Sequence, residues 1–414
     1  MASRGEHLLR TGLLFGNGSG VLGRIFARGF ARVLDHLDER LEHGGIEATL
    51  PDGTRRRIGF RAAGPVAIVR LNSWYALVRL AASGSIGWYR AWSKGEWSSP
   101  DPVPLFALFM ANAEPLGDVA RAKGSVRLFN ALRHRLRDNA PSQARDNIAA
   151  HYDLGNDFYR EWLDPTMTYS SALFDQGGDL EAGQRRKVAA LLDRLSLKPG
   201  ERLLEIGCGW GTLAIEAALR GVKVTGLTLS SEQKDWAEAK VREANLQNQV
   251  KIRLQDYREI DEHFDAIASV EMVEAVGERW WPAYLDCISR NLQPGGKAAL
   301  QLISIRHELF DAYRSSADFI QAYIFPGGCL IDEPHFEALA AQRALSWQDR
   351  RGFGLDYADT LKIWRGRYDQ AVTEGRLQEF GPAFHDLWRY YLMYCEGGFR
   401  GQGIDVAQVT LVKS

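Results

Sequence analysis

The sequence predicts an α/β protein with a doubly wound sheet and a helical cap, preceded by a small α+β domain. Three observations predict it. Strand-like apolar runs alternate with helical intervals over the second half of the chain. A glycine-rich turn, Gly207-Cys-Gly-Trp-Gly211, directly follows the first of these runs. The chain has 414 residues, which is too long for one ordinary core and favours two domains.

The alternation begins after Lys198. Strands are expected at 202–206, 223–228, 250–254, 265–270 and 297–303, and helices at 211–220, 231–245 and 279–292. The segment Leu292-Gln-Pro-Gly-Gly296 is expected to form a turn before the last strand. Such alternation favours a parallel sheet with a ligand at the carboxyl ends of its strands. Residues 306–385 interrupt the pattern and are expected to cap the site.

Residues 1–120 are expected to form the small α+β domain. Apolar residues recur at helical spacing over 22–41, with Arg24, Arg28 and Arg32 on another face. This pattern is typical of a surface helix packed on its own domain, and it also suits an interfacial helix on anionic lipid. Residues 46–69 are strand-like around a turn at Pro51-Asp52-Gly53, and 74–109 are helical and rich in aromatic residues.

A basic linker is expected at 121–148, between the first domain and a catalytic domain at 149–414. Its basic residues are Arg121, Lys123, Arg127, Arg133, His134, Arg135 and Arg137. Such a run is most often a solvated helix face. It also suits an anionic membrane leaflet, where each base contributes about 1 kcal/mol of attraction.

Composition excludes several classes of protein. A formal net charge of −1 argues against general binding of nucleic acid. The four cysteines are scattered without a C-x-x-C pair, which indicates reduced thiols and no zinc site. No metal is expected, since His307 and His335 lack the spacing of metal ligands. No run approaches the roughly 20 apolar residues of a membrane span, and no signal peptide is apparent. We expect a cytoplasmic protein at the inner face of the membrane.

The glycine turn is the most informative segment. Glycines at a strand-to-helix turn let the backbone approach a ligand and leave helix N–H groups facing it. The spacing G-x-G-x-G differs from the dinucleotide fingerprint G-x-G-x-x-G. With Glu205 before it, the turn resembles the first motif of S-adenosylmethionine-dependent methyltransferases. That resemblance implies a Rossmann-like class I methyltransferase domain. A tight turn without a ligand is the alternative.

Other segments resemble the cyclopropane-fatty-acyl-phospholipid synthase family of lipid-modifying methyltransferases. They are His151–Phe158, Met167–Ser171, Gly226–Ser230 with Gln233, Tyr323–Gly328 and Tyr391–Phe399. The N-terminal stretch through Trp97 is similar to the auxiliary domain of that family. The resemblance therefore covers most of the chain.

The resemblance implies S-adenosylmethionine as the cofactor and a set of residues that contact it. These are Tyr169, Ser170, Glu205, Gly207, Gly209, Gly211, Thr228, Leu229, Gln233, Asp256 and Tyr257. For Asp256 and Tyr257 the alternative is a solvated pair in a loop. For Thr228 and Ser230 the alternative is a helix N-cap, which would not exclude contact with the cofactor.

The resemblance also implies the catalytic positions Ser171, Glu274, Gln301 and Tyr391. In the cyclopropane synthases these positions hold a bicarbonate ion, which takes a proton from the added methyl group and closes the ring. Here Ser171 replaces a cysteine and Gln301 replaces a histidine. Gln301 cannot carry a positive charge beside an anion, so bicarbonate remains possible but is disfavoured. The structural alternatives are a carboxylate that holds a helix terminus, for Glu274, and a packed aromatic ring, for Tyr391.

We therefore expect methyl transfer from S-adenosylmethionine to the double bond of an unsaturated phospholipid acyl chain. If the ring-closing base is absent, the resulting cation has other exits, so a methyl- or methylene-branched product is favoured over a cyclopropane. A small-molecule N-methyltransferase and a lipid-binding protein with a dead site are the rival functions. The expected partners are an anionic phospholipid membrane surface, a reductase or dehydrogenase, and a second copy of the chain.

Overall fold

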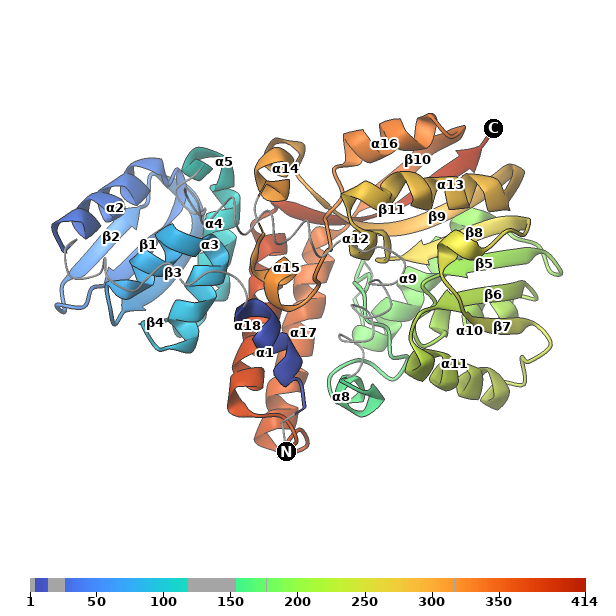
Figure 1. Cartoon of the computed structure of the whole chain (residues 1–414), viewed down its shortest axis with the longest axis horizontal. Coiled ribbons are helices and arrows are strands. Elements are labelled where there is room, and N and C mark those ends of the chain that lie inside the picture. The colour runs from blue at the N-terminus through green and yellow to red at the C-terminus, as the bar shows by residue number, and fades with distance from the viewer. Residues whose placement is uncertain (1–3, 14–26, 118–153, 176, 316) are drawn as a thin grey trace. The chain divides into compact units, whose positions relative to one another are not determined.

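The computed structural model describes residues 4–13, 27–117, 154–175, 177–315 and 317–414. The chain divides into two compact units (Figure 1). The first comprises Met1–Arg137, Arg306–Pro326 and Val372–Ile404, and the second comprises Asp138–Ile305, Gly327–Ala371 and Asp405–Ser414. The segment 306–385, expected to form one cap, is therefore divided between the two units. The expected domain boundaries near 120 and 148 lie outside the described residues, as does the basic run at 121–137.

The first unit contains a small mixed sheet with the strand order β2-β1-β3-β4. The strands are β1 (His43–Thr49), β2 (Arg55–Gly59), β3 (Ala62–Leu71) and β4 (Trp97–Ser98). The helices are α1 (Glu6–Leu13), α2 (Ala27–Arg40), α3 (Tyr75–Ser93), α4 (Val103–Ala111), α5 (Ala113–Leu116), α14 (His307–Arg314), α15 (Phe319–Tyr323) and α18 (Pro382–Arg400). The expected turn at Pro51-Asp52-Gly53 joins β1 to β2, and Gly53 there has φ +84°. The helix expected at 22–41 is α2, and 22–26 lies outside the described residues.

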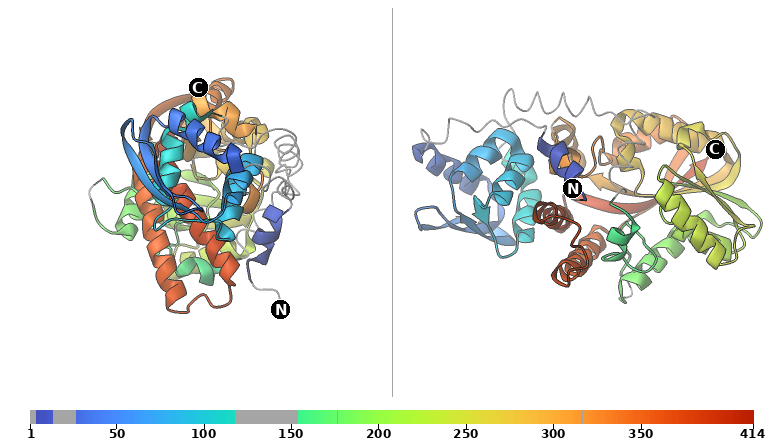
Figure 2. Two further views of the ribbon diagram at one scale, coloured as in Figure 1. Left: turned by 90° about the vertical axis from the view of Figure 1, so that its left-hand side faces the viewer. Right: turned by 60° about the horizontal axis from the view of Figure 1, so that its bottom comes forward.

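The second unit is built on a seven-stranded sheet with the order β10-β11-β9-β8-β5-β6-β7 among the described residues. The strands are β5 (Arg202–Ile206), β6 (Lys223–Thr228), β7 (Val250–Leu254), β8 (Phe264–Val270), β9 (Leu292–Ile305), β10 (Leu345–Gly352) and β11 (Ile404–Lys413). The helices are α8 (Asn156–Arg160), α9 (Leu180–Leu195), α10 (Thr212–Leu219), α11 (Ser231–Glu243), η3 (Tyr257–Glu259), α12 (Val273–Val276), η4 (Glu278–Trp280), α13 (Trp281–Asn291), α16 (Glu333–Ala341) and α17 (Gly354–Thr373). The right view of Figure 2 shows the twist of this sheet.

The expected doubly wound sheet is confirmed. Strands β5, β6, β7, β8 and β9 pair in parallel, so their carboxyl ends meet at one edge. All five lie where the sequence predicts strands. The turn expected at 292–296 is wrong, because Leu292 already pairs with Phe264 and β9 begins there. A shift of register between Phe264 and Ala266 accommodates Gly295, which has φ +75°.

The core beside this sheet is made of small and aliphatic side chains. Ala266, Ala268 and Ala299 from neighbouring strands are buried together with Leu191 and Leu203. Small side chains in the central strands let helices such as α9 lie close to the sheet. Among the described residues, no helix is both long and apolar enough to cross a bilayer.

In the first unit, helix α18 packs closely on α4 through glycine. A Cβ atom at Gly397 would overlap the Cβ of Phe106 and lie 3.0 Å from the backbone nitrogen of Ala107. Gly401, four residues further along α18, faces Ala107 and Met110 in the same way. The two helices can therefore approach only because these positions lack side chains.

We expect Gly397→Ala to lower the free energy of unfolding by about 1–3 kcal/mol, because an added methyl group must push α4 and α18 apart. The matched control is Gly366→Ala in α17, where no atom lies within 4 Å of the new Cβ. That change should raise the free energy of unfolding by about 0.5–1 kcal/mol, since alanine is the better helix former. Urea unfolding followed by circular dichroism measures both. Equal effects of the two substitutions would contradict the close packing.

Candidate cofactor and catalytic site

The glycine turn between β5 and α10 has the backbone that the motif predicts. Gly207, Gly209 and Gly211 have φ of +83°, +51° and +90°, which side chains rarely allow. The amides of Gly207 and Cys208 donate to the carbonyl of Leu227, at 3.0 and 2.8 Å, which fixes the turn to β6. Within the described part of the chain, nothing lies within 4 Å of the position of a Cβ at Gly209. A Cβ at Gly207 or Gly211 would instead lie 2.8 Å from Cγ of Met272 or 2.9 Å from Cβ of Ala237, so the turn is open at Gly209. This open cradle at a helix N-terminus suits a ligand.

Polar residues after β6 hold one another. The Thr228 hydroxyl donates to Oε1 of Gln233 at 2.9 Å and accepts the amide of Ser230 at 3.1 Å. Ser230 is the N-cap of α11, and its hydroxyl accepts the amide of Gln233 at 3.2 Å. The capping alternative thus holds for Ser230. Leu229 lies between Thr228 and Ser230 in the sequence and is partly exposed. It is two residues after Leu227, whose carbonyl accepts the amides of the glycine turn.

Asp256 and Tyr257, which follow β7, are buried. This contradicts the alternative of a solvated loop pair, because Asp256 is 2% exposed and Tyr257 7%. The Asp256 carboxylate accepts the backbone amide and Nε of Arg258 on one oxygen, both at 2.9 Å, and Nη2 of Arg258 on the other oxygen at 2.6 Å. The Tyr257 hydroxyl has no hydrogen-bond partner among the described residues, and burial raises its pKa. A buried hydroxyl without a partner is what a missing ligand would satisfy.

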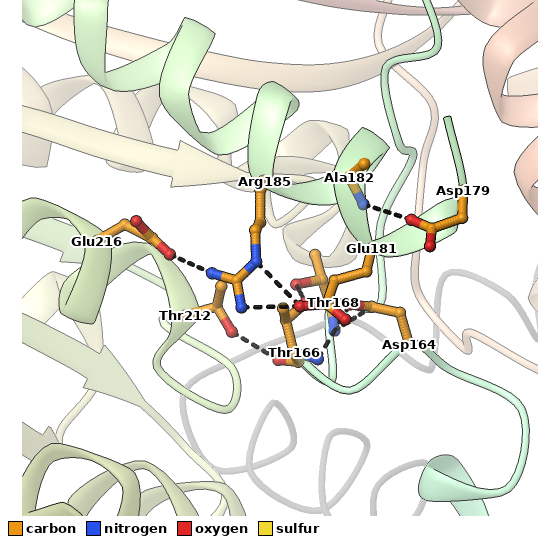
Figure 3. Close-up of polar contacts among 9 residues, drawn as sticks. All are labelled: Asp164, Thr166, Thr168, Asp179, Glu181, Ala182, Arg185, Thr212 and Glu216. Carbon is orange, nitrogen blue, oxygen red and sulfur yellow. Dashed lines mark hydrogen bonds and ion pairs between the residues drawn. The ribbon is translucent and has the colours of Figure 1, made fainter. Parts of the chain in front are cut away.

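The segment before α9 is fixed to the start of α10 (Figure 3). The Asp164 carboxylate accepts the amide and hydroxyl of Thr166, at 3.0 and 2.5 Å. The Thr212 hydroxyl, in the first turn of α10, donates to the carbonyl of Thr166 at 2.6 Å. Arg185 of α9 bridges Glu181 on its own helix and Glu216 on α10. These contacts hold the loop that carries Tyr169, Ser170 and Ser171 beside the glycine turn.

Tyr169 and Glu205 are two further predicted cofactor contacts, from the loop before α9 and from β5. The Tyr169 ring packs against Tyr159 and Trp364, with centroids 5.5 and 5.4 Å apart, and stays partly exposed. Glu205 is 3% exposed, and its Oε2 has no partner among the described residues. Burial raises the pKa of Glu205 well above its usual value, although the amide of Ala214 donates to the carboxylate.

A partly buried carboxylate that the sequence analysis did not select, Glu271, organises the predicted catalytic positions. Its Oε1 accepts the amide of Ser171 at 2.9 Å and Nε2 of Gln301 at 2.7 Å. Its Oε2 accepts the hydroxyl of Tyr357 at 2.7 Å. Glu271 follows β8 directly and has φ +47°, a conformation that is strained for a side chain of this size. Gln301 in turn accepts from Nε2 of Gln408 at 3.1 Å.

A fully buried lysine lies near this carboxylate. Nζ of Lys187, on α9, donates to the hydroxyl of Ser170 at 2.5 Å. Burial lowers the pKa of Lys187 to about 8, against the opposing charges of Glu271, Asp164 and Glu205. Burial likewise raises the pKa of Glu271, while the positive charge of Lys187 and the donors Gln301, Ser171 and Tyr357 oppose that rise. These groups favour the ionised form of Glu271, but burial has the larger effect, and the pKa of Glu271 lies above its usual value.

Glu274 is three residues beyond Glu271, on the short helix α12. Its Oε1 accepts the amide of Ile303, and its Oε2 has no partner among the described residues. Burial raises the pKa of Glu274 to about 8, and the nearby charge of Glu271 contributes. The carboxylate thus holds β9 rather than its own helix terminus. The carbonyl of Glu274 also accepts the amide of Cys329, just after the Tyr323–Gly328 motif.

Three of the four predicted catalytic residues therefore belong to one region of the second unit, and Tyr391 belongs to the first unit. Tyr391 lies on α18, where its ring packs against Trp388 and Phe325 with centroids 5.2 and 6.4 Å apart. The residues do not fit a bicarbonate ion. The donors at Ser171 and Gln301 are taken by Glu271, and an anion placed there would meet two carboxylates.

Lys187, Glu271, Tyr357 and Gln408 were missed from the sequence. Glu271 had a signal, since an acidic residue directly follows a strand that ends at the ligand-binding edge. Lys187 had a weaker one, because it interrupts the apolar face formed by Leu180, Val188 and Leu191. No signal in the sequence indicated Tyr357 or Gln408.

Comparison with known proteins identifies the family. The family described as mycolic acid cyclopropane synthetase matches residues 139–409. The chain is 38% identical over 345 residues to tuberculostearic acid methyltransferase UfaA1 of Mycobacterium tuberculosis H37Rv, covering 81% of this chain and 80% of that protein. It is 33% identical over 378 residues to the cyclopropane-fatty-acyl-phospholipid synthase of Escherichia coli K12, covering 86% and 90%.

Solved structures agree. Mycolic acid cyclopropane synthase CmaA1, complexed with SAH and CTAB, is 31% identical with a TM-score of 0.61, covering 65% of this chain and 98% of that chain. The cyclopropane synthase MmaA2 from Mycobacterium tuberculosis has the same TM-score and coverage at 30% identity. The open glycine cradle and the unpartnered Tyr257 hydroxyl fit the cofactor that such enzymes use. The chain belongs to the mycolic acid cyclopropane synthetase family and is an S-adenosylmethionine-dependent C-methyltransferase.

Proposed function

We propose that the enzyme methylates the double bond of an unsaturated phospholipid acyl chain and gives a methyl- or methylene-branched chain. The observation that supports the proposal is the partly buried Glu271 carboxylate, which accepts hydrogen bonds from Ser171 and Gln301. These are two of the positions that the resemblance assigns to an external bicarbonate. The protein's own carboxylate would thus replace the external base.

The substrate class rests on the relatives. One relative is named a tuberculostearic acid methyltransferase, and another a cyclopropane-fatty-acyl-phospholipid synthase. An acyl chain within a phospholipid places the reaction at a membrane surface, so we propose peripheral attachment to the inner leaflet. The homodimer implied by the resemblance stays a prediction.

The cofactor would be held at the carboxyl ends of β5, β6 and β7. Gly207, Gly209 and Gly211 would admit its amino-acid end, Thr228, Leu229 and Gln233 would lie beside the ribose, and Asp256 and Tyr257 would contact the adenine. Glu205 would brace the turn from the strand, with Tyr169 and Ser170 closing the site. When bound, S-adenosylmethionine supplies an electrophilic methyl group. Glu274 would line the space for the reacting double bond, and the catalytic role of Tyr391 stays a prediction from the resemblance.

Glu271 would act on the carbocation that remains in the acyl chain after methyl addition. If Glu271 takes a proton from the neighbouring carbon, the C–H electron pair forms a double bond and the product is a methylated alkene. The methylene branch forms by a second route. In that route a hydride shift first moves the positive charge to the methyl-bearing carbon. Loss of a methyl proton to Glu271 then forms a methylene branch. A reductase that supplies a hydride and a proton would convert that branch to a methyl group.

Ring closure is the second candidate product. In that outcome the C–H pair of the added methyl group attacks the cationic carbon directly while the base takes the proton. A tethered carboxylate acts from one fixed point, so its position relative to the acyl chain selects the proton that leaves. Glu271 accepts from Ser171 and Gln301, two of the positions that would hold a bicarbonate ion for ring closure. Its presence therefore favours the branched product.

The test is incubation with methyl-labelled S-adenosylmethionine and monounsaturated phospholipid vesicles, followed by mass spectrometry and NMR of the released acyl chains. We expect label in a methyl-substituted alkene or a methylene branch. Label in a strained ring would make the protein a cyclopropane synthase. Label only in added soluble amines would favour the N-methyltransferase instead.

Glu271→Gln should lower turnover by about 100-fold or more, because the amide cannot accept a proton. Its oxygen can still accept from Ser171 and Gln301, so binding of S-adenosylmethionine, measured by calorimetry, should be unchanged. Glu243→Gln, an exposed change on α11, is the matched control. Glu271→Gly should be equally inactive, yet recover partly with added bicarbonate, since glycine adopts φ +47° freely. Full activity of Glu271→Gln would rule out Glu271 as the base.

Lys187→Met should shift the pH dependence of kcat/KM. Glu271 acts as a base only when ionised, so activity falls as pH drops through its pKa. Removing the buried positive charge raises that pKa, and the acidic limb should move upward by about 1 pH unit or more. Lys198→Met, at an exposed position, should leave the limb unchanged. An unmoved limb in Lys187→Met would show that Lys187 has no electrostatic role at Glu271.

A further inference from the structure

The small sheet of the first unit has one covered face and one open face. Side chains on the covered face include Ile46, Ile58, Ala67 and Val69, all of which are buried. Helix α2 packs on β2 and helix α4 on β1 and β3. Because side chains alternate along a strand, the residues between these buried ones point to the open face.

The register of the strands places the open-face residues in rows. Glu47 lies opposite Arg57 on one side and Ile68 on the other. Thr49 lies between Arg55 and Arg70 in the same way. Both rows therefore have an arginine on β2. On β3, the first row has Ile68 and the second row has Arg70.

Large apolar side chains are exposed on this face. Val66 and Ile68, two residues apart on β3, are 47% and 55% exposed. The Phe60 ring lies on the same face, over Gly45 of β1, because a Cβ added at Gly45 would overlap the ring. Gly45 pairs with Val66 of β3, so the Phe60 ring is next to Val66 on this face. The guanidinium of Arg57 lies 4.1 Å from the centroid of the Phe60 ring. Phe60 holds this position at φ +64°.

The charge of the face is positive. Arg55, Arg57 and Arg70 outnumber Glu47, and none of the three forms an ion pair with another residue that the structure describes. On the covered face, by contrast, Arg56 is paired with Asp35 of α2 at 2.6 Å. The open-face guanidinium groups are thus available to an anionic partner.

We propose that this open sheet face docks the enzyme on the surface of an anionic phospholipid bilayer. The three guanidinium groups would bind lipid phosphates, and Val66, Ile68 and Phe60 would enter the interfacial region. A second copy of the chain is a poorer occupant, because a two-fold contact would place these arginines against one another. The proposal rests on the proposed function, in which the substrate is a phospholipid. It assigns docking to a surface other than 22–41 and 121–137.

The test compares variants of the full chain on vesicles of unsaturated phosphatidylglycerol and of phosphatidylcholine. We expect the triple variant Arg55→Gln, Arg57→Gln, Arg70→Gln to bind phosphatidylglycerol vesicles about tenfold or more weakly in co-sedimentation. We expect Val66→Thr with Ile68→Thr, which keeps β-branched residues, to weaken binding about fivefold or more on both lipids. Binding of S-adenosylmethionine should be unchanged in both variants.

The matched controls lie on the second unit. Lys198→Gln, Lys223→Gln and Lys251→Gln together remove the same charge from exposed positions, and Leu219→Thr with Leu254→Thr remove exposed apolar side chains. Wild-type vesicle binding by the two sheet-face variants would overturn the proposal, and so would equal losses in the controls. Arginine-dependent vesicle binding by an enzyme that methylates no phospholipid would support the docking face and overturn the proposed function. Analytical ultracentrifugation that shows dimer loss in the sheet-face variants would assign the face to a second copy.

Discussion

The arrangement of the catalytic region depends on the hydrogen bonds that the partly buried Glu271 carboxylate accepts. An ionised carboxylate away from water costs several kcal/mol unless it is paired and hydrogen-bonded. Its donors come from parts of the chain that are distant in sequence: Ser171 from the loop before α9, Gln301 from β9 and Tyr357 from α17. Removing the carboxylate would remove the acceptor that these three donors share. The same group that suits a base therefore also fixes the loop that lies beside the cofactor turn.

This constraint gives a reason for glutamine at position 301. The side chain must donate to Glu271 and accept from Gln408 at the same time. A carboxamide offers both a donor and an acceptor in a fixed plane, and it needs no proton from solvent. An imidazole can do the same only in one neutral tautomer. Gln301 thus belongs with Glu271 as one unit, whereas it looked like an isolated departure in the sequence.

The sequence predicted what is determined locally. The five parallel strands were found because each is a short apolar run between turn signals, and the glycine turn because its φ values require glycine. Strands β10 and β11 were missed, since β10 is largely exposed and polar and both follow long helical segments. Asp256 was selected as a cofactor contact, which stays a prediction, and its ion pair with Arg258 was not anticipated. The partnership of Glu271 with Tyr357 joins residues 86 positions apart, and no local pattern records such a contact.

The cofactor turn and the residues around Glu271 differ in how easily substitutions can change them. The cofactor half of the site rests on backbone geometry within one βα turn, so it changes little without losing the fold. In the proposed reaction the fate of the acyl cation rests on Glu271, whose protonation depends on donors from three other elements and on the charge of Lys187. A few substitutions among those donors alter the position and basicity of the carboxylate while the glycine turn stays intact. Product identity is therefore better inferred from the tertiary partners of Glu271 than from the motif that identifies the cofactor.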